Sequence, residues 1–234
     1  MSGARPLAVV LASGGMDSTV AAWLAARDHE LALLHASYGQ RTAARERRAF
    51  EAIADRLALP ASRRRTLDIG FLAALGGSAL TDPALPLPID GEGRERAPGL
   101  PVTYVPFRNA HLLAAAVSWA ELLGARAVVI GAVEEDSSGY PDCRAEFLSA
   151  FERAARIGTG LGERIAIEAP LVHLTKGEIV RAGVLAGAPF ELTWSCYLDE
   201  EEACGRCESC RLRLKGFREA GIVDPIPYRA GTVR

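Results

Sequence analysis

The sequence predicts an α/β fold, a doubly wound and mainly parallel sheet of the Rossmann-like type with a cysteine-rich C-terminal segment. Three observations predict it. Apolar runs of strand length alternate with segments of helical period, which is typical of parallel strands joined by helices. A glycine-rich loop follows the first apolar run directly, and four cysteines gather between residues 196 and 210. We expect residues 1–190 to form the main domain and residues 191–234 to pack on it.

Strands and helices follow one another in a regular order. The runs of strand length are 6–12, 31–36, 62–67, 127–132 and 165–168. The segments of helical period are 20–26, 40–57, 109–123, 144–157 and 175–187. In the second of these segments Phe50, Ile53 and Leu57 share one face, which predicts an amphipathic helix. Residues 76–101 are rich in glycine and proline. A long stretch without expected secondary structure is often functional, so we interpret it as a loop covering the substrate.

Charge and hydrophobicity exclude two classes of function. The 234 residues carry 27 basic and 29 acidic side chains, a formal net charge of -2. No positive excess is present to grip a nucleic acid along its length. No run approaches the ~20 apolar residues that span a bilayer. We therefore expect neither nucleic acid nor membrane as a partner. A reducing cytoplasm is the expected location, with the five cysteines not joined in disulfides.

The loop SGGMDST at 13–19 predicts an anion site. Gly14 and Gly15 permit a sharp turn and close approach of the backbone amides, while Ser13, Ser18 and Thr19 add hydroxyl donors. Together with the positive end of the following helix, these groups suit a phosphate. A tight turn with Asp17 or Ser18 as the helix N-cap is the alternative. Neither G-x-x-x-x-G-K-[ST] nor G-x-G-x-x-G occurs at this loop.

Lys176 is one of only two lysines in the chain. Thr175 and Glu178 have the spacing of a capping box, which places Lys176 in the first turn of a helix. A cation there opposes the helix dipole by about 0.3–1 kcal/mol, and a bound anion reverses this effect. We infer that Lys176 and nearby amides hold a phosphate. The alternative is a lysine whose stem carries its charge into water.

Four cysteines have the spacing C-x7-C-x2-C-x2-C, namely Cys196, Cys204, Cys207 and Cys210. Four thiolates closing around one ion are what a structural zinc site needs, with no open position for catalysis. An iron–sulfur cluster and free thiols are the alternatives. Cys143 stands apart as either a nucleophile at the start of a helix or a structural thiol.

Several motifs resemble known families. SGGMDST resembles the loop of the PP-loop ATP pyrophosphatases, and LTKGEIV at 174–180 is similar to their lysine helix. SYGQR at 37–41, VPFRN at 105–109, EEDSSGYPDCR at 134–144 and the TWSCY to CGRCESCRLR tail resemble the 7-cyano-7-deazaguanine synthases. The match covers nearly the whole chain. Two departures are Thr42, where the family usually has histidine, and Phe107, where it usually has a small residue.

The resemblance implies an adenine nucleotide alpha-hydrolase-like fold and a carbon–nitrogen ligase. Such an enzyme converts 7-carboxy-7-deazaguanine and ammonia to the nitrile through adenylated intermediates, in queuosine or other 7-deazapurine biosynthesis. It implies ATP, Mg²⁺ and one structural Zn²⁺ per chain, with Lys176 and Asp17 as catalytic residues. The expected nucleotide-binding residues are Ala12, Ser13, Gly14, Gly15, Met16, Asp17, Ser18, Thr19 and Lys176.

The base needs a cation for its carboxylate and an acceptor for its amino edge. Candidates from the matching motifs are Arg108, Asn109, Tyr140, Asp142 and Arg144. Helix capping, ion pairing or, for the tyrosine, an interior position are the alternatives. Two other functions stay open: a related enzyme that acylates a macromolecular amine or thiolates tRNA, and a zinc-ribbon binding module. The oligomeric state is undetermined, with a homodimer as one option.

Overall fold

The computed structural model describes residues 4–92, 95–134 and 139–232. Its centre is a five-stranded sheet in the order β3-β2-β1-β6-β7, with every neighbouring pair parallel. The strands are β1 Leu7–Leu11, β2 Glu30–Ser37, β3 Arg64–Asp68, β6 Ala127–Ile130 and β7 Ala166–Glu168. The sheet grows outward on both sides of β1, so the predicted doubly wound α/β class is confirmed.

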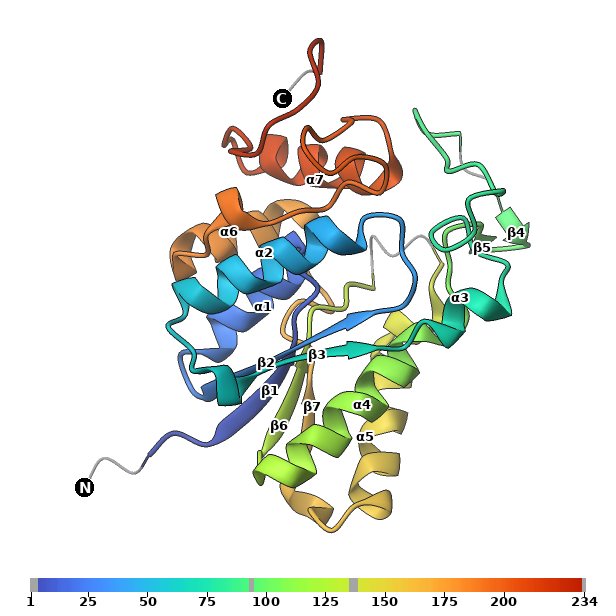
Figure 1. Cartoon of the computed structure of the whole chain (residues 1–234). Coiled ribbons are helices and arrows are strands. Elements are labelled where there is room, and N and C mark those ends of the chain that lie inside the picture. Colours follow the sequence, from blue (N-terminus) through green and yellow to red (C-terminus); the bar gives the residue numbers. More distant parts are fainter. Residues whose placement is uncertain (1–3, 93–94, 135–138, 233–234) are drawn as a thin grey trace.

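Helices cover both faces of this sheet (Figure 1). One face carries α1 Met16–Ala25, α2 Ala43–Arg56 and α6 Lys176–Ala186, and the other carries α4 Arg108–Leu123 and α5 Ala145–Gly158. Alternate residues of β1 serve the two sides, since Val10 belongs to one apolar cluster and Val9 to the other. A strand buried on both faces is apolar throughout, which explains the continuous run in the sequence.

The remaining elements are short, apart from α7. They are α3 Phe71–Leu75, β4 Glu95–Ala97, β5 Leu100–Pro101, α7 Glu208–Glu219 and the 3-10 turns Ala61–Arg63, Pro141–Cys143, Gly162–Arg164 and Phe190–Leu192. Among the described residues, no helix is both long and apolar enough to cross a bilayer.

The segment 76–101 corrects one expectation. It contains the antiparallel hairpin β4–β5, whose turn includes Gly99 at φ 75°, a conformation that glycine adopts readily. Arg41 ties the segment down by donating to the carbonyls of Ala79, Asp82 and Leu85. The segment is therefore not without secondary structure. Its role in covering the substrate stays a prediction, and residues 93–94 lie outside the described residues.

The C-terminal segment packs on α2 and α6. Its four cysteines, Trp194, Ile226 and Tyr228 form an apolar cluster that also contains Ala49 of α2. Gly216 of α7 lies against the first turn of α6, because a Cβ there would come 2.9 Å from the Lys176 carbonyl oxygen. The segment thus reaches the neighbourhood of Lys176. A domain boundary at residue 190 stays a prediction.

A buried ion pair fixes α7 to the chain that follows it. Arg213 donates to both carboxylate oxygens of Asp224 at 2.7 and 2.9 Å, and the two side chains are 1% and 0% exposed. Removing one partner of a buried pair costs about 3–5 kcal/mol. We expect Arg213→Ala to lower the free energy of unfolding by that amount in urea titrations. The control is Arg48→Ala, whose ion pairs lie at the surface and contribute less than about 1 kcal/mol. Equal losses in the two variants would contradict this prediction.

His35 on β2 makes stability depend on pH. Its ring packs on Phe50, Nδ1 lies 3.1 Å from the Ala12 carbonyl oxygen, and Nε2 is buried without a hydrogen-bond partner among the described residues. Burial lowers the pKa of His35 below 6.5. The unfolded chain then binds a proton near pH 6.5 that the folded protein rejects.

The contribution of His35 to the free energy of unfolding is therefore fully present above about pH 6.5. It decreases below that pH, by up to about 1.4 kcal/mol per pH unit. Urea titrations between pH 5 and 7 measure this slope. We expect His35→Gln to flatten it, and the surface variant His173→Gln to retain it. A wild-type slope that survives in His35→Gln would assign the pH dependence to other groups.

Candidate active site

A cavity of about 290 Å³ opens at the carboxyl ends of β1, β2 and β6. Leu11 and Ile130, the last residues of β1 and β6, and Ala36, next to the last residue of β2, lie in its wall. The crevice beside the strand where a doubly wound sheet reverses direction is where such folds bind ligands. Candidates from distant parts of the sequence meet here. Those lining the cavity are Ala12, Ser13, Gly15, Met16, Asp17, Ser18, Lys176, Arg108, Asn109 and Tyr140.

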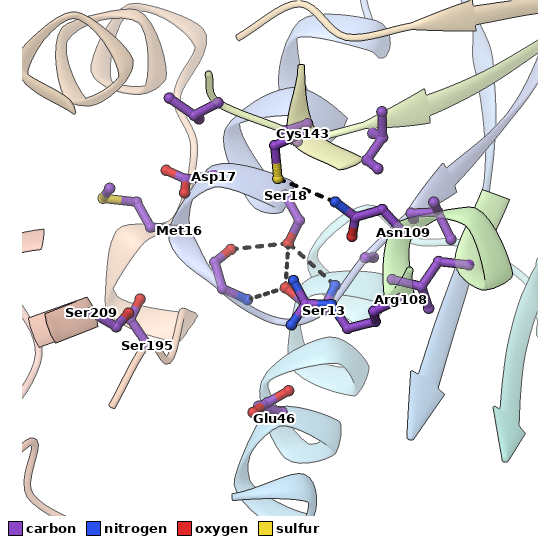
Figure 2. A pocket seen from close by; sticks show the side chains of 18 of the residues that line it. Ser13, Met16, Asp17, Ser18, Glu46, Arg108, Asn109, Cys143, Ser195 and Ser209 are labelled. Atoms are coloured by element: carbon purple, nitrogen blue, oxygen red, sulfur yellow. Dashed lines mark hydrogen bonds between the residues drawn. The ribbon is translucent and has the colours of Figure 1, made fainter. Parts of the chain in front are cut away.

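The glycine loop turns directly from β1 into α1. Gly14 has φ 85°, and a Cβ on it would lie 2.5 Å from the Glu46 carbonyl oxygen, so the turn requires glycine. Ser13 Oγ and Ser18 Oγ are 3.0 Å apart, and the Gly15 amide donates to Ser13 Oγ (Figure 2). Thr19 donates its hydroxyl to the Gly15 carbonyl, an internal bond of the turn.

Helix α1 begins earlier than expected. Gly15, with extended backbone, is its N-cap and provides no side-chain cap. The alternative with Asp17 or Ser18 as N-cap is therefore wrong, because both residues already lie in the first helical turn. Amides of a first turn have no partner inside the helix. With no capping side chain, they are available to an anion in the cavity.

Lys176 faces this loop from α6. The predicted capping box of Thr175 and Glu178 is confirmed, and Lys176 is the first residue of the helix. Its Nζ lies 2.8 Å from Asp17 Oδ2, and its side chain is only 8% exposed. The alternative of a solvated lysine is therefore wrong. Asp17 Oδ1 is buried and has no hydrogen-bond partner among the described residues, so it can accept a further ligand.

Arg108 and Asn109 come from the first turn of α4. Arg108 Nη1 donates to the Tyr38 hydroxyl at 3.1 Å, and its guanidinium lies over the Tyr38 ring. Burial opposes the charge on Arg108, but neighbouring Tyr38, Tyr140 and Asp142 raise its pKa overall. Asn109 Nδ2 donates to Cys143 Sγ at 3.2 Å. This half of the cavity thus contains a cation, an amide and a thiol.

Asp142 and Arg144 do not line the cavity. Asp142 Oδ2 accepts the backbone amide of Asn109 at 2.9 Å, so it caps α4, as the structural alternative predicted. Burial raises the pKa of Asp142, against the opposing effects of the Asn109 bond and of Arg108. Arg144 is exposed at the start of α5. Residues 135–138 of the matching motif lie outside the described residues.

The C-terminal segment supplies a further wall, which the sequence did not predict. Tyr197, Glu208 and Ser209 all line the cavity. Tyr140 donates to Thr103 Oγ1 at 2.8 Å, and Thr103 donates to Glu208 Oε2 at 3.3 Å. Tyr38, Glu46 and Cys143 are also wall residues missing from the predicted set. Tyr38, Cys143 and Tyr197 lie within the quoted motifs, so a signal existed for them. Glu46 had none.

The four tail cysteines fit a single metal ion. Their sulfur atoms all lie within 4.8 Å of one another, and all four residues are buried. Tetrahedral bonds of about 2.3 Å to zinc place sulfurs about 3.8 Å apart, close to the 3.9 Å between Cys204 and Cys210. A four-iron cluster contains a larger core between its cysteines, so this alternative fits less well. Backbone amides of Arg206 and Cys207 donate to Cys204 Sγ, which stabilises a thiolate.

Together these features are those of a PP-loop type α/β enzyme, with a loop suited to an anion at the reversal point of its sheet and four tail cysteines placed to fit one metal ion. Residues 7–221 match the family model described as queuosine biosynthesis protein QueC. The chain belongs to this family.

Curated relatives resemble the chain over nearly their whole length. A 7-cyano-7-deazaguanine synthase from Koribacter versatilis is 57% identical over 226 residues, covering 94% of this chain and 92% of the relative. Its counterpart from Acidobacterium capsulatum is 55% identical, covering 97% and 99%. That from Nautilia profundicola is 51% identical, covering 95% and 98%.

Proposed function

We propose that this chain converts 7-carboxy-7-deazaguanine and ammonia to 7-cyano-7-deazaguanine at the expense of ATP, in queuosine biosynthesis. The observation that carries the proposal is the 57% identity to a synthase of that name over 94% of the chain. The cavity supports it, because a loop suited to an anion and a half with a cation and tyrosines line the same space. Those two halves suit a nucleotide and a flat anionic base.

The chemistry requires two activations of oxygen. A carboxylate has no leaving group, so its oxygen attacks the α-phosphate of ATP and releases pyrophosphate. Ammonia then displaces AMP and gives the amide, with loss of a proton. The amide oxygen attacks the α-phosphate of a second ATP and releases a second pyrophosphate. Loss of AMP and of both protons of the amide nitrogen then leaves the nitrile. Both attacks build negative charge on phosphates, which positioned donors and cations stabilise.

The residues have corresponding roles in this proposal. Loop residues 13–18 and Lys176 bind the phosphates, and Arg108 binds the carboxylate of the base. Thr19 only stabilises the turn, because its amide and hydroxyl both donate to the Gly15 carbonyl. Asp17 Oδ1 is the oxygen available to Mg²⁺, an ion that prefers one or two carboxylates together with substrate phosphates. The four tail cysteines hold one Zn²⁺, which organises the wall formed by Tyr197 and Glu208.

The alternatives are not favoured. Acylation of a macromolecular amine, tRNA thiolation and a pure binding module all lack support from relatives that carry the name of a small-molecule synthase. A cytoplasmic location and a homodimer belong to the same proposal as further expectations.

Mass spectrometry of the reaction products tests this function. Purified protein is incubated with the carboxylated base, ¹⁵N-ammonium, ATP and Mg²⁺. We expect a nitrile containing ¹⁵N, together with AMP and pyrophosphate. Absence of both nitrile and AMP would contradict the proposal. A sulfur-containing product or a covalent adduct on a macromolecule would favour one of the other enzymes instead.

A further inference from the structure

Glu46 is a carboxylate in the cavity wall to which the mechanism above gives no role. It comes from α2 and lies apart from the loop residues Ser13 and Ser18 in the same cavity wall (Figure 2). Gln40 Nε2 donates to its Oε2 at 3.0 Å, and Thr42 Oγ1 donates to its Oε1 at 3.0 Å. Each oxygen therefore has one neutral donor and one remaining acceptor position. Among the described residues, Glu46 has no ion-pair partner.

The surroundings of Glu46 leave its charge incompletely satisfied. Burial raises the pKa of Glu46, while the bonds from Gln40 and Thr42 and the charge of Arg108 lower it. A buried carboxylate is stable when hydrogen bonds replace its lost water. Two neutral donors supply part of this requirement. Donors on a bound ligand would complete it, and the fixed orientation of the two oxygens favours a ligand with two adjacent N–H groups.

Arg108 lies within electrostatic range of the same carboxylate. Tyr38 connects the two, since it accepts a hydrogen bond from Arg108 and its pKa responds to the charge of Glu46. A cation and a paired acceptor therefore share one half of the cavity. A deazaguanine carboxylate has the complementary arrangement, with an anion on its five-membered ring and two N–H donors on the pyrimidine edge.

We propose that Glu46 recognises the ring N–H and the exocyclic amine of the base as a bidentate acceptor. This inference rests on the proposed function and identifies its specificity residue. It replaces Asp142 in that role, because Asp142 already accepts the Asn109 amide and does not line the cavity. Glu208, another carboxylate of the wall, accepts a hydrogen bond from Thr103 at Oε2 and is the alternative acceptor that the test below includes.

Binding measurements on two bases test the proposal. Affinities for 7-carboxy-7-deazaguanine and for its analogue without the 2-amino group are measured by calorimetry, with a non-hydrolysable ATP analogue present. Losing a hydrogen bond to a charged group should weaken wild-type binding about 10- to 100-fold. Glu46→Gln should bind the carboxylated base more weakly and lose most of this preference. Glu51→Gln, which removes a half-exposed carboxylate from the same helix, should keep it.

Several results would overturn the proposal. They are a wild-type preference below about threefold, a Glu46→Gln variant that retains the wild-type preference, and a loss of preference in Glu208→Gln alone. A variant whose defect is confined to the KM for ammonia would make Glu46 an ammonium site instead. Affinity for the ATP analogue and the thermal transition confirm that each variant is folded.

If Glu46→Gln does not fold, the wild-type preference for the 2-amino group still tests the proposal, because a preference below about threefold overturns it. If wild-type protein does not bind the carboxylated base at all, the proposed function itself is wrong. If it binds the base and only the preference behaves otherwise, this inference alone is wrong.

Discussion

Lys176→Ala is expected to reduce ATP-dependent AMP formation by about 10²- to 10³-fold, the usual effect of removing a donor that stabilises developing charge. Lys176 Nζ lies 2.8 Å from Asp17 Oδ2, and the lysine side chain is only 8% exposed. Its positive charge is therefore held at the loop and not in solvent. The substitution also leaves Asp17 without its cation at the point where phosphate oxygens would bind. Quench-flow or steady-state measurement of AMP release checks the rate.

The chain provides a matched control for this variant. Lys215, the other lysine, is 50% exposed on α7 and does not line the cavity. Lys215→Ala should leave AMP release within about twofold of wild type, as most surface substitutions do. If Lys176→Ala keeps more than a tenth of the wild-type rate while it remains folded, the lysine has no role in activating the substrate.

Loss of one tail cysteine is expected to have the largest structural effect. Cys204 Sγ receives two backbone amide bonds and lies within 4.8 Å of the three other sulfurs. A structural zinc ion contributes about 10–16 kcal/mol of apparent binding free energy. Cys204→Ser should therefore lower the metal content from one ion per chain to nearly none. Tyr197 and Glu208 belong to this segment and line the cavity, so the affinity for the base should also fall.

Metal analysis and hydrogen exchange test that prediction. In the variant we expect rapid exchange of the α7 amides, while those of β1 and β6 keep their protection. Cys143→Ala is the control for metal content, because its thiol belongs to the cavity and not to the cluster. A Cys204→Ser protein that keeps its metal ion and a protected α7 would exclude the proposed metal role.

The sequence predicted those parts of the site that are local in the chain. The glycine loop, the capping box at Thr175 and the cysteine spacing each have physical causes within about 20 residues, so their geometry was accessible before any tertiary information. Strands β1, β2 and β6 were equally accessible, because burial on both faces makes their runs apolar. The outer strands β3 and β7 were also predicted, although they are only partly buried. Hairpin β4–β5 was not predicted because its strands are only three and two residues long and β4 is exposed.

Contacts between distant segments were not accessible in this way. The pair of Lys176 with Asp17 spans 159 positions, and that of Thr103 with Glu208 spans 105. Glu46 lies in an arginine-rich helix whose charges suggest a solvated face, and only the packing of α2 beside the loop turns it into the cavity. Asp142 was assigned to the substrate from its motif, whereas its carboxylate is used by the backbone of α4.

If one cavity activates two oxygens in succession, the ratio of AMP to nitrile reveals both activations. Starting from the carboxylated base, we expect two AMP for each nitrile formed. Starting from the corresponding amide, we expect one AMP for each nitrile, with no requirement for ammonia. A ratio of one from the acid, or an amide that the protein cannot convert, would exclude two successive activations.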